Sequence, residues 1–171
     1  QWCQRTNRHL IVDEIYQNLL FNDALISSLA ISEQHFVVGS FSKYFNMTGW
    51  RLGWLVIPEY ALEATQRLAQ HLFICAPSFA QEAALACFEH KALRDAEMHR
   101  LELKERRDLL IPRLEAMGFK IAAEPDGAFY VFVDVADIAE DSQQFCAELI
   151  CKTGVAITPG IDFSKSLPPT W

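Results

Sequence analysis

Lys43 lies in a stretch whose residue types could hold a phosphate group beside a reactive amine. Two hydroxyl side chains, Ser40 and Ser42, come just before it, and Arg51 follows eight residues later among glycines. Hydroxyl groups and a guanidinium suit phosphate oxygens, and glycines let the backbone come close to a ligand. The stretch therefore predicts an anion site with an amine next to it.

Asp13 ends a second stretch that could serve the same site. It closes the apolar run 9–13, and Ser40 closes the run 36–40. Both runs predict buried strands, and the 22 residues between them exceed the dozen or so that a right-handed parallel crossover needs. Because open α/β sheets bind ligands at the carboxyl ends of parallel strands, we expect Asp13 and Lys43 at one site.

Further elements must position these strands. The run Leu52–Ile57 stops at Pro58, which cannot extend a strand ladder, and indicates an antiparallel neighbour. Pro112 lies inside a long helical pattern and predicts a bend or break just before it, while Gly118 is placed to end that helix. Helical spacing of apolar residues predicts helices within 59–77, 81–88 and 92–117.

The sequence after Gly118 predicts a small α+β unit. Residues 120–124 and 128–134 indicate a hairpin around Pro125-Asp-Gly127, followed by a helix over 142–152 and a strand over 155–158. We therefore expect a domain boundary near Gly118, with a large domain over residues 1–117 and a small domain over 118–171.

The composition argues against several classes of function. Of the 171 residues, 51% are apolar, so the chain can bury a sizeable core. A formal net charge of −7 disfavours nucleic acids and anionic membranes as partners. Apolar runs such as Phe129–Val133 fall short of the roughly 18 residues of a membrane span, and no leader-like segment opens the chain. We expect a soluble, cytoplasmic protein.

Cysteine and histidine spacing does not indicate a metal site. The five cysteines form no C-x-x-C pair, and the five histidines form no H-E-x-x-H motif. We therefore expect thiols in a reducing compartment and no bound metal.

Separated motifs resemble the core of one enzyme family. Asp13-Glu-Ile-Tyr16, Ser40-Phe-Ser-Lys43 and Gly49-Trp-Arg51-Leu-Gly53 are similar to motifs of the fold-type I, class I/II pyridoxal-phosphate aminotransferases, the aspartate and aromatic aminotransferase group. Gly127-Ala-Phe-Tyr130 and Gly154-Val-Ala-Ile-Thr-Pro-Gly160 resemble strands of that family's small domain. The resemblance implies an α/β fold: the C-terminal part of a large domain with a mixed, mainly parallel sheet and helices, then part of a small α+β domain.

The resemblance also implies a role for each residue of the motifs. Lys43 resembles the lysine that holds pyridoxal 5′-phosphate as an internal aldimine and later moves a proton between the substrate α-carbon and the cofactor C4′. Asp13 resembles the acid that keeps the pyridine nitrogen protonated, so that the ring accepts electrons. Tyr16 would hydrogen-bond the cofactor's phenolic oxygen. The phosphate would be held by Ser40, Ser42 and Arg51.

Structural roles remain open for several of these residues. Tyr16 could pack under the sheet with its hydroxyl bonded to the backbone. Only one of Ser40 and Ser42 need face a phosphate, and Ser40, at the strand end, is favoured over Ser42. Glu14 is expected to point away from Asp13 and to serve the structure. Four aromatic residues are expected in the core rather than around a substrate: Trp50, Trp54, Phe129 and Tyr130.

The resembled family has further elements that this chain does not show. A ring-stacking residue, an asparagine and a glycine-rich phosphate loop would precede Asp13, and an arginine for the substrate carboxylate would follow Gly160. We therefore expect an internal fragment of a longer aminotransferase. Such a fragment would bind the cofactor weakly and turn over little substrate.

Two classes of function follow as hypotheses. The first is transamination between an amino acid and a 2-oxo acid, in a full-length parent that is a homodimer. The alternative is a catalytically incomplete fragment, or a regulatory or binding module that keeps the fold. Elimination, decarboxylation or cyclisation with the same cofactor also stays open, because one scaffold serves many reactions.

Overall fold

The computed structural model describes residues 2–21 and 26–163, apart from the side chain of Gln4. These residues divide into two compact units. Unit 1 holds the described residues up to Leu103 together with Asp126–Ala128, and unit 2 holds the others. The domain boundary expected near Gly118 stays a prediction.

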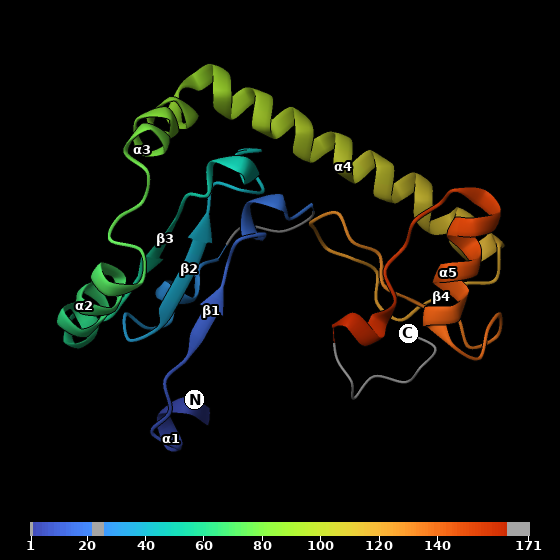
Figure 1. The fold of residues 1–171 in the computed structure, drawn as a ribbon, viewed down its shortest axis with the longest axis horizontal. Helices are drawn as coiled ribbons and strands as arrows, with labels where there is room; N and C mark the ends of the chain where they lie inside the picture. The colour runs from blue at the N-terminus through green and yellow to red at the C-terminus, as the bar shows by residue number, and fades with distance from the viewer. Residues whose placement is uncertain (1, 22–25, 164–171) are drawn as a thin grey trace. The chain divides into compact units, whose positions relative to one another are not determined.

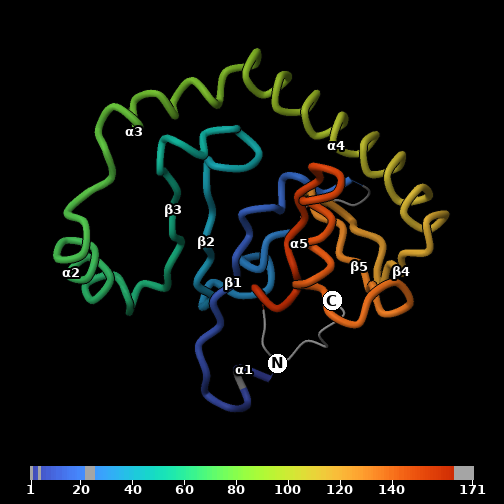
Figure 2. Tube along the Cα trace, turned by 45° about the vertical axis from the view of Figure 1, so that its right-hand side comes forward, coloured from blue at the N-terminus to red at the C-terminus, as the bar shows by residue number. Residues whose placement is uncertain are grey.

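A three-stranded sheet forms the centre of unit 1. Its strands β1 (Ile11–Asp13), β2 (Phe36–Ser40) and β3 (Gly53–Val56) lie side by side in that order (Figures 1 and 2). β1 runs parallel to β2, and β3 runs antiparallel to it, so both predicted pairings are confirmed. The sheet thus contains both strand directions, and its two parallel strands, β1 and β2, end at the same edge.

The strand register decides which side chains share a face of this sheet. Asp13 pairs with Val38, and Ser40 follows two residues later on β2. Because side chains alternate along a strand, Asp13, Val38 and Ser40 point to one face. Gly39 points to the other face, where it pairs with Trp54 of β3.

Gly39 is buried because the indole ring of Trp54 covers it. A Cβ atom at Gly39 would lie 2.1 Å from Cε2 of Trp54. We expect Gly39→Ala to lower the free energy of unfolding by about 1–3 kcal/mol, because the ring must leave its place over the central strand. Gly49→Ala is the matched control, since nothing lies within 4 Å of a Cβ at that position. Urea unfolding measures both, and equal midpoints would contradict this packing.

Four helices of the described chain lie wholly or partly in unit 1, and α3 contributes to its core. They are α1 (Trp2–Arg5), α2 (Leu62–Leu72), α3 (Ser78–Leu85) and the first part of α4 (His90–Ala116). Short 3-10 turns lie at Gln17–Leu19, Ser28–Ala30, Thr48–Trp50, Glu59–Ala61 and Ala86–Phe88. The buried cluster consists of Met47, Leu52, Ala80, Ala84 and Cys87. The small side chains at Ala80 and Ala84 let α3 pack closely against the loop after β2.

Pro112 does not interrupt α4, which continues to Ala116. Of the bend or break expected before it, the break is therefore wrong, and the bend stays a prediction. Pro112 is exposed, so water can bond the carbonyl that the proline leaves without a donor. The predicted stop is confirmed. Gly118 has a φ of 94°, its N–H donates to the Glu115 carbonyl at 2.9 Å, and the Phe119 N–H donates to the Leu114 carbonyl at 3.1 Å. This pair of bonds ends the helix in a Schellman motif.

Unit 2 is an α+β unit with little strand. β4 (Lys120–Ile121) pairs antiparallel with β5 (Val133–Asp134), and α5 covers Ser142–Thr153. The expected hairpin is shorter than predicted because its middle, Asp126–Ala128, belongs to unit 1. The strand expected over 155–158 is not assigned, since no described strand pairs with it.

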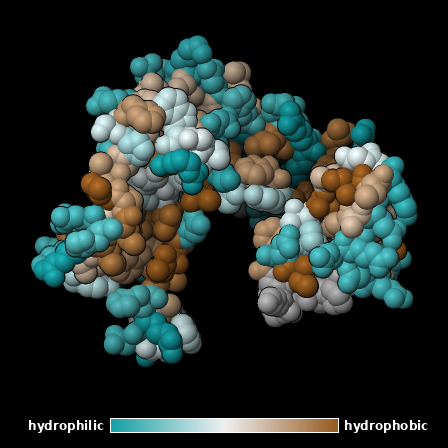
Figure 3. All heavy atoms as spheres, in the orientation of Figure 1, coloured by the Kyte–Doolittle hydropathy of each residue, from teal (hydrophilic) through white to brown (hydrophobic). Residues whose placement is uncertain are grey.

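Apolar side chains remain exposed on unit 1. The β3 residues Leu55 and Val56 are 46% and 38% exposed. Figure 3 shows brown, hydrophobic side chains gathered beside α2. Contiguous apolar surface of this kind marks a contact surface. The four aromatic residues expected in the core are 41–54% exposed, so that prediction is wrong: Trp50, Trp54, Phe129 and Tyr130. No helix among the described residues is long and apolar enough to cross a membrane.

Candidate functional site

Asp13 forms the turn that follows β1. Its Oδ1 accepts a hydrogen bond from the backbone N–H of Ile15 at 3.1 Å, a local bond that short acidic side chains favour. The 3-10 turn Gln17–Leu19 begins directly afterwards and is closed by a bond from the Leu19 N–H to the Tyr16 carbonyl at 2.8 Å. The backbone bonds of these turns thus fix the positions of Asp13 and Tyr16 relative to each other.

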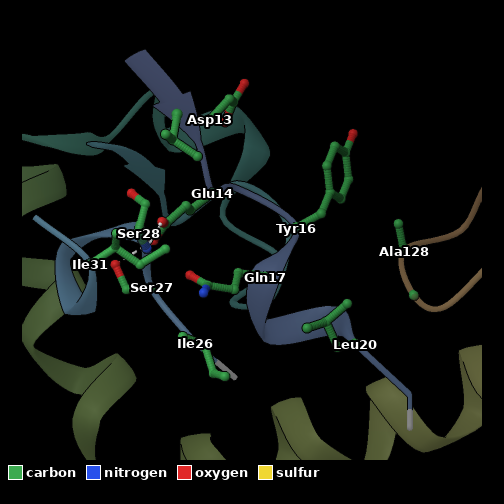
Figure 4. A pocket seen from close by; sticks show the side chains of 12 residues that line it. Asp13, Glu14, Tyr16, Gln17, Leu20, Ile26, Ser27, Ser28, Ile31 and Ala128 are labelled. Carbon is green, nitrogen blue, oxygen red and sulfur yellow. Dashed lines mark hydrogen bonds between the residues drawn. The ribbon is translucent and has the colours of Figure 1, made fainter. Parts of the chain in front are cut away.

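An open pocket of about 520 Å³ lies beside these residues in unit 1 (Figure 4). Asp13 and Tyr16 line it together with Gly127 and Ala128. The other lining residues are Val12, Glu14, Gln17, Leu20, Ile26, Ser27, Ser28 and Ile31. The pocket therefore joins the end of β1, the crossover and the segment Asp126–Ala128.

Lys43 approaches Tyr16 from a second loop. Its Nζ lies 5.6 Å from the centroid of the Tyr16 ring, within the range of a cation–π contact. A turn positions it: the Asn46 N–H donates to the Lys43 carbonyl at 3.1 Å, and Asn46 takes a left-handed φ of 55°, which asparagine tolerates well. Two loops thus bring an amine and a phenol together, although 26 residues, Gln17 to Ser42, separate Tyr16 from Lys43 in the sequence.

Ser40, Ser42 and Arg51 lie outside the pocket. The Ser40 hydroxyl donates to the Leu52 carbonyl at 3.3 Å and accepts from the Ser42 N–H at 3.0 Å. Arg51 is exposed, has a φ of 54°, and donates from Nη1 to the Thr48 carbonyl at 2.8 Å. The structure therefore brings Asp13 and Tyr16 to one pocket and Lys43 to the Tyr16 ring, but it does not bring Ser40, Ser42 or Arg51 to the pocket, and their role as phosphate ligands stays a prediction.

Glu14 serves the structure, as expected. Its carboxylate accepts from the Ser27 hydroxyl at 2.9 Å and from the Ser28 N–H at 2.7 Å, and Figure 4 shows it pointing toward both serines. These two bonds fix the crossover against the end of β1. The carboxylate that remains beside Tyr16 is that of Asp13.

Sequence reasoning missed the contribution of Gly127 and Ala128 to the pocket. Gly127 pairs with Leu20, the Phe21 N–H donates to the Asp126 carbonyl at 2.7 Å, and the Ala128 N–H donates to the Leu19 carbonyl at 3.0 Å. A Cβ at Gly127 would lie 2.6 Å from the Leu19 carbonyl oxygen, so only glycine allows this approach. The Pro-Asp-Gly sequence indicated a turn, but nothing local indicated a partner more than 100 residues earlier.

Comparison with known proteins decides the family. A sequence model described as Aminotransferase class I and II matches residues 1–171. The chain belongs to this family. It is 43% identical over 167 residues to a valine–pyruvate aminotransferase of Mycobacterium tuberculosis, and 36% identical over 167 residues to an aspartate aminotransferase of Thermotoga maritima. A crystal structure of an aminotransferase from M. tuberculosis superposes with a TM-score of 0.93 at 40% identity.

The aminotransferase chain spans less than half the length of these relatives. The two sequence matches cover 96% and 95% of this chain but 43% and 42% of the relatives. The structural match covers 99% of this chain and 44% of the solved one. The expected identity as an aminotransferase fragment, with a mixed α/β fold, is confirmed.

The residues at this site fit the chemistry of pyridoxal phosphate. Lys43 supplies a primary amine for an aldehyde, and Asp13 supplies a carboxylate for a pyridinium nitrogen. Tyr16 contributes a hydroxyl for a phenolate. Arg51 lies outside the pocket, but a guanidinium has five N–H donors, so it keeps several for a phosphate besides the one bonded to Thr48. No donor in this set conflicts with the groups of the cofactor.

Proposed function

We propose that this chain provides the cofactor site of an enzyme that transfers an amino group between an amino acid and a 2-oxo acid, with pyridoxal phosphate as the cofactor. The observation that carries the proposal is the approach of Lys43 to Tyr16, which shares a pocket with Asp13. Lys43 lies 5.6 Å from the Tyr16 ring, and Tyr16 lines one pocket with Asp13. Membership of the aminotransferase family supports it.

Each residue would hold one part of the cofactor. Lys43 would bind its aldehyde carbon covalently, Asp13 would form a salt bridge with its ring nitrogen, and Tyr16 would donate a hydrogen bond to its phenolic oxygen. When bound, pyridoxal phosphate supplies an electron-accepting ring that stabilises negative charge at the substrate α-carbon. Ser40, Ser42 and Arg51 are the proposed phosphate ligands.

The proton transfer is assigned to Lys43. Once the substrate amine had replaced it on the aldehyde carbon, the freed Nζ would take the proton from the substrate α-carbon as a general base and give it up again as a general acid. The Tyr16 ring, 5.6 Å away, limits the directions in which the lysine side chain can swing. The carboxylate of Asp13 favours a positive charge on the group that it faces, which keeps a proton there throughout.

The proposed partners are small molecules and a second copy of the chain. An amino acid and a 2-oxo acid are the substrates of the reaction. Exposed apolar residues of unit 1, among them Leu55 and Val56 of β3, support a homodimer in the full-length parent.

A half-reaction tests the proposed function. The purified protein is mixed with pyridoxal phosphate, freed of excess, and its visible absorption band is recorded. An amino acid should remove the band and release one equivalent of 2-oxo acid, and a second 2-oxo acid should restore it. A band that no amino acid changes would favour the binding-module alternative, and the lack of any protein-bound band would refute the proposal.

A further inference from the structure

A hydrogen bond between side chains joins the loop of Lys43 to α4. The amide nitrogen of Asn46 lies 2.7 Å from Nδ1 of His99, which accepts the bond when its proton is on Nε2. Asn46 also closes the turn that begins at Lys43, with its backbone N–H 3.1 Å from the Lys43 carbonyl oxygen. A shift of the Asn46 side chain therefore moves the backbone of Lys43.

The segment of Tyr16 is fastened to the neighbouring residue of α4. Nη1 of Arg100 donates to the Leu20 carbonyl at 2.8 Å, and Leu20 ends the 3-10 turn that starts after Tyr16. The guanidinium is itself fixed by Glu97, with Nε 2.9 Å from Oε2 and Nη2 2.6 Å from Oε1. The Arg100 side chain is only 17% exposed, so this paired arrangement is rigid.

Both fastenings lie on one turn of α4, close to the sheet. Ala96, one turn earlier on the same face, is 5% exposed, and its small side chain lets the helix approach. Tyr44, next to Lys43, interacts electrostatically with the same turn. Burial is the main cause that raises the pKa of Tyr44, the Glu97 carboxylate raises this pKa further, and the Arg100 guanidinium lowers it. Tyr44 therefore lies within electrostatic reach of Glu97 and Arg100.

We propose that one turn of α4 positions Lys43 and Tyr16 relative to each other, because His99 holds the loop of Lys43 and Arg100 holds the segment of Tyr16. His99 and Arg100 are positioning residues, since they act through Asn46 and Leu20. The inference rests on the proposed function, because Lys43 and Tyr16 must stay together only if both hold the same cofactor. The fastening itself is a property of the fold and can be measured without cofactor.

Four variants test the positioning. His99→Leu removes the acceptor for Asn46, whereas His99→Asn places an amide oxygen near the position of Nδ1. Arg100→Met keeps the aliphatic stem and removes the donor to Leu20. Arg94→Met, on an exposed part of the same helix, is the matched control for loss of an arginine from α4.

Hydrogen exchange of backbone amides is the first measurement and needs no cofactor. His99→Leu should speed exchange at Asn46 and Met47, and Arg100→Met should speed it at Leu19 and Phe21, each by about 2–10-fold, the range expected for one lost hydrogen bond. His99→Asn should restore slow exchange, and Arg94→Met should match the wild type. Exchange in His99→Leu and Arg100→Met that equals the Arg94→Met control would overturn the inference.

Retention of pyridoxal phosphate is the second measurement. The apparent dissociation constant should rise by about 2–10-fold in His99→Leu and in Arg100→Met and stay unchanged in the control. A wild type that holds no cofactor would refute the proposed function while leaving the exchange result in force. If Arg100→Met does not fold, Glu97→Gln replaces it, because loss of the carboxylate charge loosens the guanidinium and should speed exchange at Leu19 and Phe21 as well.

Discussion

Replacement of Lys43 by alanine is expected to abolish reductive trapping of pyridoxal phosphate on the protein. Borohydride reduces the carbon–nitrogen double bond between the cofactor aldehyde and a lysine amine, so the label marks the residue that bound it. In the wild type, mass spectrometry of peptides should find the label on Lys43. In Lys43→Ala it should fall to background, and amino transfer should slow by about 10²–10⁴-fold through loss of the proton carrier.

The other described lysines provide the internal comparison for this experiment. Each forms an ion pair with an acidic side chain: Lys91 with Asp95, Lys104 with Asp108, Lys120 with Asp137 and Lys152 with Glu148. Hydrogen bonds that Lys120 and Lys152 donate to the carboxylates of Asp137 and Glu148 raise the pKa of both lysines, which keeps those amines protonated and poorly nucleophilic.

Lys43→Arg separates charge from chemistry at this position. Arginine can keep a cation over the Tyr16 ring but offers no primary amine to an aldehyde. We expect it to fold like the wild type and to trap no label. Label spread evenly over several lysines in the wild type, or unchanged label in Lys43→Ala, would contradict the role of Lys43.

Asp13→Asn is expected to raise the dissociation constant for pyridoxal phosphate by about 10–100-fold. A hydrogen bond to a charged group contributes about 1.5–3 kcal/mol, and each 1.36 kcal/mol corresponds to a factor of ten. Asparagine keeps the side-chain oxygen that accepts from the Ile15 N–H at 3.1 Å, so the turn after β1 should be retained. The variant therefore removes the charge and little else, and fluorescence quenching on titration with cofactor measures the change.

Asp134→Asn is the matched control, because the same local bond occurs there. Oδ1 of Asp134 accepts from the Ala136 N–H at 2.9 Å, and Asp134, in unit 2, is not one of the residues that line the pocket. Its dissociation constant for the cofactor should equal that of the wild type. Equal affinity in Asp13→Asn and Asp134→Asn would show that the carboxylate of Asp13 does not face the ring nitrogen.

Local sequence patterns predicted most of the elements correctly. The apolar runs that end at Asp13 and Ser40 form β1 and β2, as predicted. The length of the crossover between them correctly predicted their parallel pairing. Gly118 ended α4 because a positive φ is open to glycine at no cost in strain. These features depend on neighbours within a few residues, which is the range that sequence patterns report.

Among the predictions that failed, two depended on distant residues or on solvent. The break at Pro112 did not occur, since the residue faces water on an otherwise continuous helix. The hairpin expected around Gly127 shrank to two residue pairs, because its middle pairs with Leu20 instead. No periodicity within residues 120–134 could have indicated that partner.

The sequence by itself determined the family, the mixed sheet and the identity of Lys43, Asp13 and Tyr16 as candidate site residues, because motifs and strand ends are local. Only the tertiary structure decided that Lys43 meets Tyr16, that Gly127 closes one wall of the pocket, and that His99 and Arg100 hold the two loops. The physical reason is that each of these contacts joins segments far apart in the chain, and their distances are set by packing of the whole unit rather than by the residue types at either end.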